Sequence, residues 1–257
     1  MGRKELIKKI TEKKDFSEIA NRDVEFALSR FEKKDVSDEE KIRLTRDLLH
    51  RVFGAFTSRK LLSPKDKDAE WILRKHLSTR ERLEFYGEIY KKLLKGLKSK
   101  ISVIDFGAGI NGFSYSYFEK IGFNVSYTAV ESVGQLVCLM NSYFEKNKFD
   151  ANAIHASLFE LDKIKDVLKK NKKPRVVFLF KVIDSLEMME RDYSKKFLLE
   201  ISKCSERIVL SFATESMVKR RKFRADRKWI INFIEDNFSI LGNFEIGSER
   251  YIVFEKK

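Results

Sequence analysis

Apolar residues in the first hundred positions recur every three or four residues, which is the spacing that predicts amphipathic helices. The residues that form this pattern are Leu6, Ile7, Ile10, Ile19, Val24, Phe26, Ala27, Phe31, Leu44, Leu48, Leu49, Val52, Phe53, Leu83, Tyr86, Ile89, Tyr90 and Leu93. Ser37 with Glu40, and Ser78 with Glu81, have the spacing of a capping box and predict two helix starts. Ser63-Pro64 predicts a break between helices. The first part of the chain is therefore expected to be helical.

From Ile101 onward, short apolar segments alternate with helical ones such as Gln135–Lys146 and Tyr193–Lys203. The predicted strands are Ile101–Phe106, Val125–Glu131, Ala151–Ala156, Arg175–Lys181, Arg207–Phe212, Ser239–Ile246 and Arg250–Glu255. This alternation is typical of parallel βαβ units, and the short gap between the last two strands predicts an antiparallel hairpin. The expected fold is α/β, a Rossmann-like methyltransferase domain over residues 76–257, with a seven-stranded and mostly parallel sheet. A helical N-terminal domain over residues 1–75 precedes it.

The charge of the chain predicts a polyanionic partner. Its 257 residues include 53 Lys and Arg against 39 Asp and Glu, a formal net charge of +14. Nucleic acid or an anionic membrane face would suit such a surplus, whereas a merely heat-adapted surface would raise both signs together. The hydrophobic fraction of 43% excludes wholesale disorder.

The residue counts also argue against several kinds of site and location. Two cysteines, Cys138 and Cys204, cannot build a disulfide framework, which favours a reducing compartment. The N-terminus has no apolar signal segment, and no apolar run is long enough to cross a membrane. Three histidines without a His/Cys cluster predict no metal site. We expect a cytoplasmic protein that does not associate with membranes.

The strongest local signal is the segment from Val103 to Gly112, where an apolar strand leads into a glycine turn and a helix start. Gly107, Gly109 and Gly112 have GxGxxG spacing, and such glycines let the backbone approach a ligand closely. Asp105 stands two residues before the first glycine and suits a cationic ligand, S-adenosylmethionine (SAM), better than a pyrophosphate. The alternative is a turn that serves packing only. The sequence favours the class I SAM-dependent methyltransferase fold.

Two later strand ends supply the other candidate cofactor contacts. Glu131 ends the second predicted strand, where a carboxylate can accept both ribose hydroxyls of a nucleoside, although it can also cap a helix. Ser157-Leu158 follows the third strand, where the edge of an adenine would lie, although an ordinary loop fits equally well.

The end of the fourth strand narrows the chemistry. Phe180-Lys181 is followed by no proline motif of the kind used by exocyclic-amine methyltransferases, and Cys138 and Cys204 lie in predicted helices, where they are most simply core thiols. Attack by a ring nitrogen with a free lone pair remains. Guanine N7 needs no base catalyst, so positioning would be enough.

Basic residues gather in two places. The run from Lys219 to Trp229 holds seven basic residues and one acid, and it follows the fifth strand, at the expected rim of the active site. Arg and Lys interleaved with aromatic residues suit phosphate contacts and stacking, although a solvated face is the alternative. The N-terminal segment adds Arg3, Lys4, Lys8, Lys9, Lys13 and Lys14.

The segment His76–Leu83, HLSTRERL, resembles the His-x-Ser-Thr-Arg/Lys-Glu-Arg segment of the 16S ribosomal RNA (guanine-N7) methyltransferases that confer aminoglycoside resistance. The segment from Val103 to Phe113 resembles the strand and glycine loop of that family. Phe178–Lys181 followed by Leu186-Glu187 resembles its Phe-Lys…Leu-Glu segment, and Ser211–Ser216 resembles its Ser-Phe-Pro-Thr-Lys/Arg-Ser segment. The resemblance runs from about residue 70 to the end, and more loosely through the helical region. The Lys-rich composition points to a divergent member from a thermophile.

The resemblance implies a SAM-dependent RNA methyltransferase that acts on guanine N7 in 16S rRNA of the small ribosomal subunit. It implies that Arg80 holds the SAM carboxylate and that no side chain is needed as a general base. The full set of implied cofactor residues is His76, Arg80, Asp105, Gly107, Ala108, Gly109, Glu131, Ser132, Ser157, Leu158 and Phe180. The implied target-positioning residues are Lys181, Ser211, Phe212, Arg220 and Lys222.

Departures from the family concentrate near the target side, where Gly112 and Ala213 replace prolines and Glu215 replaces a base. Two rival functions stay open. One is a small-molecule SAM-dependent methyltransferase, and the other is an inactive RNA-binding or ribosome-assembly factor. We expect a monomer whose natural role is RNA modification.

Overall fold

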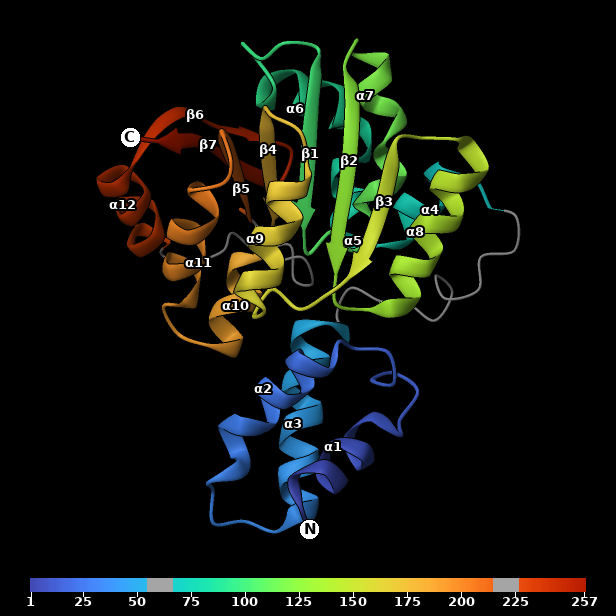
Figure 1. The fold of residues 1–257 in the computed structure, drawn as a ribbon, viewed down its shortest axis with the longest axis vertical. Helices are drawn as coiled ribbons and strands as arrows, with labels where there is room; N and C mark the ends of the chain where they lie inside the picture. Colours follow the sequence, from blue (N-terminus) through green and yellow to red (C-terminus); the bar gives the residue numbers. More distant parts are fainter. Residues whose placement is uncertain (55–66, 215–226) are drawn as a thin grey trace.

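The computed structural model describes residues 1–54, 67–214 and 227–257, and it has two parts (Figure 1). The larger part is a sheet covered by helices. A bundle of three helices lies against the edge of the sheet toward which the parallel strands point, and the N-terminus lies at the far end of this bundle. The predicted break at Ser63-Pro64 lies outside the described residues.

The sheet has seven strands in the order β3-β2-β1-β4-β5-β7-β6. The first five in sequence are parallel, whereas β7 is antiparallel to β5 and β6 is antiparallel to β7. The strands are β1 Lys100–Phe106, β2 Asn124–Glu131, β3 Ala151–His155, β4 Arg175–Phe180, β5 Arg207–Ala213, β6 Phe238–Ile246 and β7 Glu249–Lys256. The predicted fold class is confirmed, including the C-terminal hairpin, whose turn holds Gly247 at a φ of +59°.

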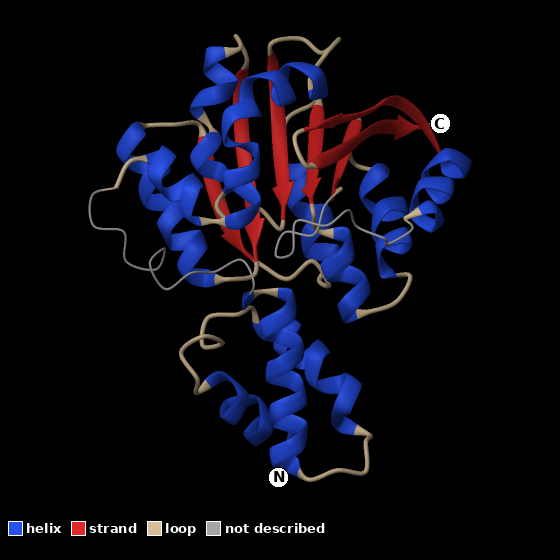
Figure 2. Ribbon diagram, turned by 180° about the vertical axis from the view of Figure 1, so that it is seen from behind, coloured by secondary structure: helices blue, strands red, loops and turns tan. Residues whose placement is uncertain are grey.

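Helices cover both faces of the sheet (Figure 2). Successive strand residues face opposite sides, so Val103 and Ile104 of β1 belong to two separate apolar cores. Because both faces are buried, the strands read as nearly continuous apolar runs. The core of Val103 is closed by α4 Ala69–Lys75, α6 Tyr86–Leu93, α7 Ser116–Lys120 and α8 Gly134–Asn147. The core of Ile104 is closed by α9 Leu161–Lys170, α10 Ile183–Met189, α11 Tyr193–Ser202 and α12 Lys228–Asn237.

The N-terminal bundle has an apolar core of its own. It consists of α1 Arg3–Thr11, α2 Asn21–Glu32 and α3 Asp38–Val52. Ile10, Val24 and Leu49 are completely buried between these helices. The predicted helix start at Ser37 is confirmed, because its side chain accepts a hydrogen bond from the backbone N–H of Glu40 at 3.2 Å.

The bundle contacts the loops that follow β2 and β3. Ile19 forms a β-bridge with Val133, and the N–H of Ala20 donates to the carbonyl of Ser132 at 2.8 Å. The rings of Phe26 and Phe159 stack with their centroids 4.4 Å apart. The bundle therefore meets the carboxyl end of the sheet, where ligands bind in open α/β folds.

The segment before β1 packs against the sheet. Ile72 and Leu73 of α4 belong to the core of Val103, whereas the division of the chain after residue 75 stays a prediction. The next helix, α5, spans Leu77–Arg82 and begins two residues before the start that a cap at Ser78 predicts. The predicted capping box at Ser78 is therefore wrong: Ser78 lies inside the helix, and its hydroxyl accepts a bond from the buried guanidinium of Arg82.

Candidate functional site

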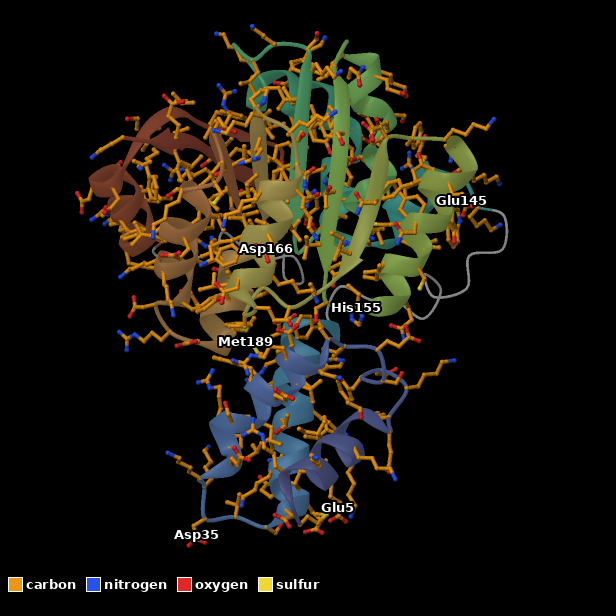
Figure 3. All side chains as sticks on the ribbon, viewed as in Figure 1. Glu5, Asp35, Glu145, His155, Asp166 and Met189 are labelled. Atoms are coloured by element: carbon orange, nitrogen blue, oxygen red, sulfur yellow. The ribbon has the colours of Figure 1, made fainter. Side chains whose placement is uncertain are left out.

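A pocket lies where the carboxyl ends of β1, β2 and β4 meet the N-terminal bundle. The glycine loop after β1, the end of β2 and the start of α10 form most of its wall, and Asp23, Val52 and Phe53 come from the bundle. Met189, another wall residue, lies at the junction of the two parts (Figure 3). The site is thus shared between segments far apart in the sequence.

The glycine loop needs glycine at two positions for the pocket and at a third for packing. Gly107 and Gly109 have φ angles of +66° and +56°. A Cβ on Gly107 would lie 2.7 Å from a methyl group of Val182, and one on Gly109 would lie 3.2 Å from Nε2 of His76. A Cβ on Gly112 would instead meet the ring of Phe144 at 2.5 Å, so this glycine lets the loop approach α8.

Asp105 ends β1 as a buried carboxylate in the pocket wall. Its Oδ2 accepts hydrogen bonds of 2.7 Å from the amide of Asn111 and from the hydroxyl of Tyr127. Burial raises the pKa of Asp105 to about 6, although both hydrogen bonds oppose this shift. A positively charged ligand in the pocket would stabilise the ionised form.

Glu131 ends β2 and fixes the glycine loop. Its Oε2 accepts from the N–H of Gly109 at 2.8 Å, and its Oε1 accepts from the N–H of Val133 at 2.9 Å. Burial raises the pKa of Glu131, while the backbone hydrogen bonds lower it. Val133 is also the N-cap residue of α8, so the capping alternative for Glu131 holds in part. Each oxygen keeps a lone pair for a ligand hydroxyl.

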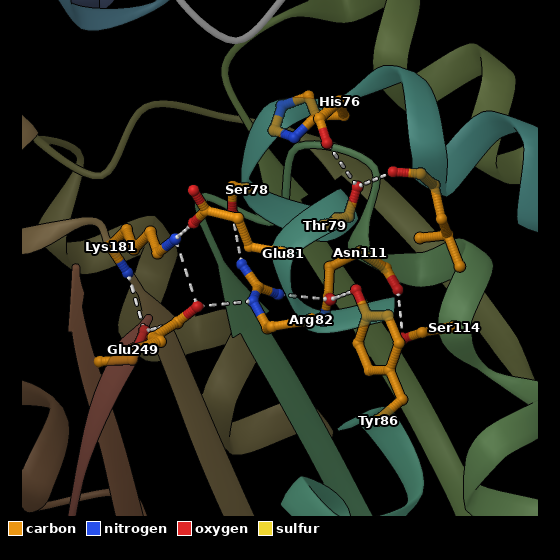
Figure 4. A network of polar contacts seen from close by, with 12 residues as sticks. His76, Ser78, Thr79, Glu81, Arg82, Tyr86, Asn111, Ser114, Lys181 and Glu249 are labelled. Atoms are coloured by element: carbon orange, nitrogen blue, oxygen red, sulfur yellow. Dashed lines mark hydrogen bonds and ion pairs between the residues drawn. The ribbon is translucent and has the colours of Figure 1, made fainter. Parts of the chain in front are cut away.

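Arg82 is the centre of a buried polar network (Figure 4). Its Nε lies 3.1 Å from Oε2 of Glu249, and its Nη1 donates to Oδ1 of Asn111 at 2.8 Å. The guanidinium also lies over the ring of Phe180, 4.7 Å from its centroid. Arg82 lines the pocket, and a guanidinium there can donate further hydrogen bonds to a ligand carboxylate.

Lys181 is the second cation in the pocket wall. Its Nζ pairs with Glu81 and lies 3.3 Å from Oε2 of Glu249. The residue has a φ of +59°, and its backbone N–H donates to both the carbonyl and the hydroxyl of Ser211 at 3.1 and 3.2 Å. Ser211 donates its hydroxyl to Glu249. Ser211 therefore positions Lys181 and is itself completely buried.

Most of the predicted site residues gather at this pocket. Those in its wall are His76, Asp105, Gly107, Ala108, Gly109, Glu131, Ser132, Leu158, Phe180 and Lys181. Burial, with the nearby charges of Arg82 and Lys181, lowers the pKa of His76 to about 3, so its ring is neutral at pH 7. Ser157 is completely buried beside the wall. Arg220 and Lys222 lie outside the described residues.

Two predicted residues point elsewhere. Arg80 is exposed and is not part of the pocket wall, whereas Arg82 is buried in it. Residues two apart on a helix point about 200° from each other, so α5 cannot present both to the same site. Phe212 was expected to stack on a target base, but it packs in the core of Ile104, and Arg227 covers its ring at 5.2 Å.

Among the wall residues that sequence reasoning missed, three have a charged or amide side chain: Asp23, Arg82 and Asn111. Arg82 stands in the same octet as Arg80, and the apolar spacing of Leu83, Tyr86 and Tyr90 could have placed Arg82 on the buried side. Asn111 follows the glycine loop directly. No local signal marks Asp23, because it comes from a separate part of the fold.

The described residues contain no group of His, Cys, Asp or Glu that could hold a metal ion. Within those same ranges, no helix is long and apolar enough to cross a membrane. The wall instead combines three carboxylates with two cations and several apolar side chains. Such a set can bind a ligand that carries a carboxylate, positive charge, sugar hydroxyls and a flat apolar base.

Solved structures resemble the chain along its whole length. The 16S rRNA methylase RmtB matches with a TM-score of 0.79 and 17% identity, covering 100% of this chain and 99% of its own. The 16S rRNA methyltransferase RmtF, solved with S-adenosyl-L-homocysteine, matches with a TM-score of 0.78 and 18% identity, covering 100% of both chains. The chain has the fold of the 16S rRNA methylases. This methylase fold includes the N-terminal bundle as well as the sheet.

The sequence of the chain is also similar to that of a curated 16S rRNA methyltransferase. The 16S rRNA (guanine(1405)-N(7))-methyltransferase of Proteus mirabilis is 23% identical over 197 residues, which cover 72% of this chain. The aligned part spans 64% of the length of that protein. No family model matches the chain.

Proposed function

We propose that this chain is a SAM-dependent RNA methyltransferase that methylates guanine N7 in the 16S rRNA of the small ribosomal subunit. The observation that carries the proposal is the likeness to 16S rRNA methylases over the whole chain, and the pocket at the strand ends of this chain supports it. The relative from Proteus mirabilis, whose name specifies guanine N7, supports the target atom. A monomeric state and a cytoplasmic location remain predictions.

The polar groups of the pocket suit the amino-acid part of SAM. Arg82 and Lys181 are the cations for its carboxylate, and Asp105 is the carboxylate for its ammonium group. We assign the carboxylate contact to Arg82 in place of Arg80, because Arg82 lines the pocket. His76 and Phe180 complete this part of the wall.

A second set of wall residues suits the nucleoside part of SAM. Glu131 is the acceptor for ribose hydroxyls, and its hydrogen bond to Gly109 ties the sugar site to the glycine loop. Val133, Leu136 and Leu158 offer apolar surface for the faces of an adenine. The residue chemistry therefore fits SAM as a whole.

When bound, SAM supplies an electrophilic methyl group on a positively charged sulfonium. Guanine N7 would accept this methyl group with its free lone pair: an N–C bond would form, the C–S bond would break, and its electron pair would stay with sulfur. The positive charge moves to the guanine and no proton leaves, so no side chain acts as a base. What the chain contributes is orientation and exclusion of water, through the buried network of Arg82, Glu249 and Lys181.

The acceptor is proposed to be RNA because of the net charge of +14. In an A-form helix the major groove is too deep and narrow for side chains, so the target base must be unpaired or extruded. Among the predicted target-positioning residues that the structure describes, Lys181 lies in the pocket wall, next to the proposed site of the methyl donor.

The test is methyl transfer from tritiated SAM to three acceptors: small subunits, large subunits and bulk tRNA. We expect label in small subunits only, with the Arg82→Lys variant much slower and an Arg80→Ala variant near wild type. Label in no RNA, despite SAM binding, would favour the small-molecule alternative. RNA binding without SAM binding would favour an inactive assembly factor.

A further inference from the structure

Asp23 is a buried carboxylate that the N-terminal bundle places in the pocket wall. It lies in the first turn of α2 and is only 2% exposed. Apart from the apolar Val52 and Phe53 at the end of α3, the other wall residues belong to the sheet, to the helices near it and to the loops between them. Asp23 therefore does not follow from the strand-end logic that locates Asp105, Glu131 and Lys181.

Two serine hydroxyls hold Asp23 in place. Ser132, just after β2, donates to Oδ2, and Ser157, just after β3, donates to Oδ1 at 2.7 Å. Ser157 in turn accepts a bond from the N–H of Phe159 at 3.0 Å. The carboxylate thus bridges the ends of two neighbouring strands and has a defined orientation.

The surroundings leave this carboxylate with unused acceptor capacity. Two carboxylate oxygens can accept about four hydrogen bonds, and the two serines use two of them. Burial, helped by the nearby carboxylates Glu131 and Glu160, raises the pKa of Asp23 to about 6, although the two serine hydrogen bonds oppose this shift. A ligand N–H directed at Asp23 would relieve this unfavourable burial.

The position of Asp23 relative to the other wall residues indicates which group of the ligand would donate a hydrogen bond to it. Glu131, at the end of β2, suits the ribose, and Leu158, after β3, offers apolar surface next to it. Asp23 sits between the segments that follow β2 and β3, on the nucleoside side of the pocket. Adenine has one strong donor on its edge, the exocyclic amino group.

We propose that Asp23 selects the adenine base of the methyl donor by accepting a hydrogen bond from its exocyclic amino group. The inference rests on the proposed SAM-dependent function. It makes the N-terminal bundle part of the donor pocket, so the bundle and the sheet must be docked before the donor binds in full. A hypoxanthine base carries an oxygen in place of this amino group and would face the carboxylate with acceptor against acceptor.

The experiment compares two ligands on the full chain by calorimetry: S-adenosyl-L-homocysteine and its deaminated analogue, S-inosyl-L-homocysteine. A hydrogen bond to a charged acceptor corresponds to about tenfold or more in affinity, and we expect wild type to prefer the adenine ligand by at least that factor. Asp23→Asn should shrink the preference to about threefold or less, because the amide can donate to hypoxanthine and accept from adenine. Asp35→Asn, on the exposed tip of the bundle (Figure 3), is the matched control and should keep the wild-type preference.

The two ligands separate a recognition role from a structural one. A residue that only clips the bundle to the sheet would, on replacement, weaken both ligands by the same factor and leave their ratio unchanged. That result overturns the proposal, as does a wild type that binds both ligands equally, which needs no variant. A wild type that binds neither ligand would instead refute the proposed SAM-dependent function.

Discussion

Replacing Arg82 with alanine should lower the free energy of unfolding by about 3 kcal/mol. Arg82 and Glu249 form an ion pair at 3.1 Å, and their side chains are only 3% and 2% exposed. Breaking a buried pair by removing one partner usually costs about 3–5 kcal/mol, because the other charge stays buried. The value should fall at the lower end here, because Lys181 remains 3.3 Å from the same oxygen of Glu249.

The neighbours of Arg82 support the same magnitude. Asn111 loses the guanidinium from its Oδ1 but keeps the hydroxyl of Tyr86 at 2.8 Å, so no buried acceptor is left unpaired there. The hydroxyl of Ser78 loses a donor, and the ring of Phe180 loses a cation that lay 4.7 Å from its centroid. These smaller losses keep the total near 3 kcal/mol and well above zero.

The assay is urea unfolding monitored by circular dichroism, with Arg80→Ala as the matched control. Arg80 stands on the same helix and is exposed, so its replacement should change the free energy of unfolding by less than about 0.5 kcal/mol. Calorimetry with S-adenosyl-L-homocysteine then tests the ligand role, where Arg82→Lys keeps the charge but loses the fork of donors. The reasoning is refuted if the two alanine variants are equally stable, or if Arg80→Ala loses the ligand while Arg82→Lys binds it normally.

Three further outcomes follow from particular residues. Gly107→Ala should lower the free energy of unfolding in urea by about 2–3 kcal/mol, because the φ of Gly107 is positive and a Cβ there would meet Val182. Gly87→Ala in α6 is the control and should be neutral or slightly stabilising, because the space around Gly87 is open. Equal effects of the two substitutions would contradict this prediction. Burial raises the pKa of Asp105 above its unfolded value to about 6, so the protein should lose about 2 kcal/mol of stability relative to Asp105→Asn as the pH rises from 4 to 7. A pH-independent difference between the two proteins in urea unfolding would count against this prediction. The net charge of +14 predicts that the affinity for small ribosomal subunits, measured by filter binding, falls steeply between 50 and 200 mM salt. The affinity for S-adenosyl-L-homocysteine should stay nearly constant over the same range. An affinity for small subunits that does not change with salt would point to a small-molecule acceptor.

The fold could be predicted from the sequence because its signals are local. Each predicted strand corresponds to an observed one, since strands buried on both faces read as apolar runs such as Val176 to Phe180. The predicted cap at Ser37 is also a local signal, because the serine and its partner Glu40 are only three residues apart, and the structure confirms it. The capping box at Ser78 failed because a buried guanidinium, which no local pattern reveals, uses that hydroxyl.

The candidate site could be predicted only where one strand end supplies it. Asp105, Gly107 and Glu131 lie in the pocket wall as expected, because the carboxyl ends of parallel strands converge. The choice between Arg80 and Arg82 depends on which side of a short helix faces the sheet, and the spacing of two residues within one motif does not reveal it. Asp23 depends on how the bundle docks, more than a hundred residues away from Ser132 and Ser157 in sequence.

The most direct test is to map the methyl group. After incubation of the protein with SAM and small ribosomal subunits, the 16S rRNA is reduced with borohydride and cleaved with aniline, which breaks the chain at N7-methylguanosine, and primer extension locates the break. We expect one new stop at a single guanine, absent without SAM and absent with Arg82→Lys. Label incorporated into 16S rRNA without any such cleavage would place the methyl group on another atom and contradict the proposed chemistry.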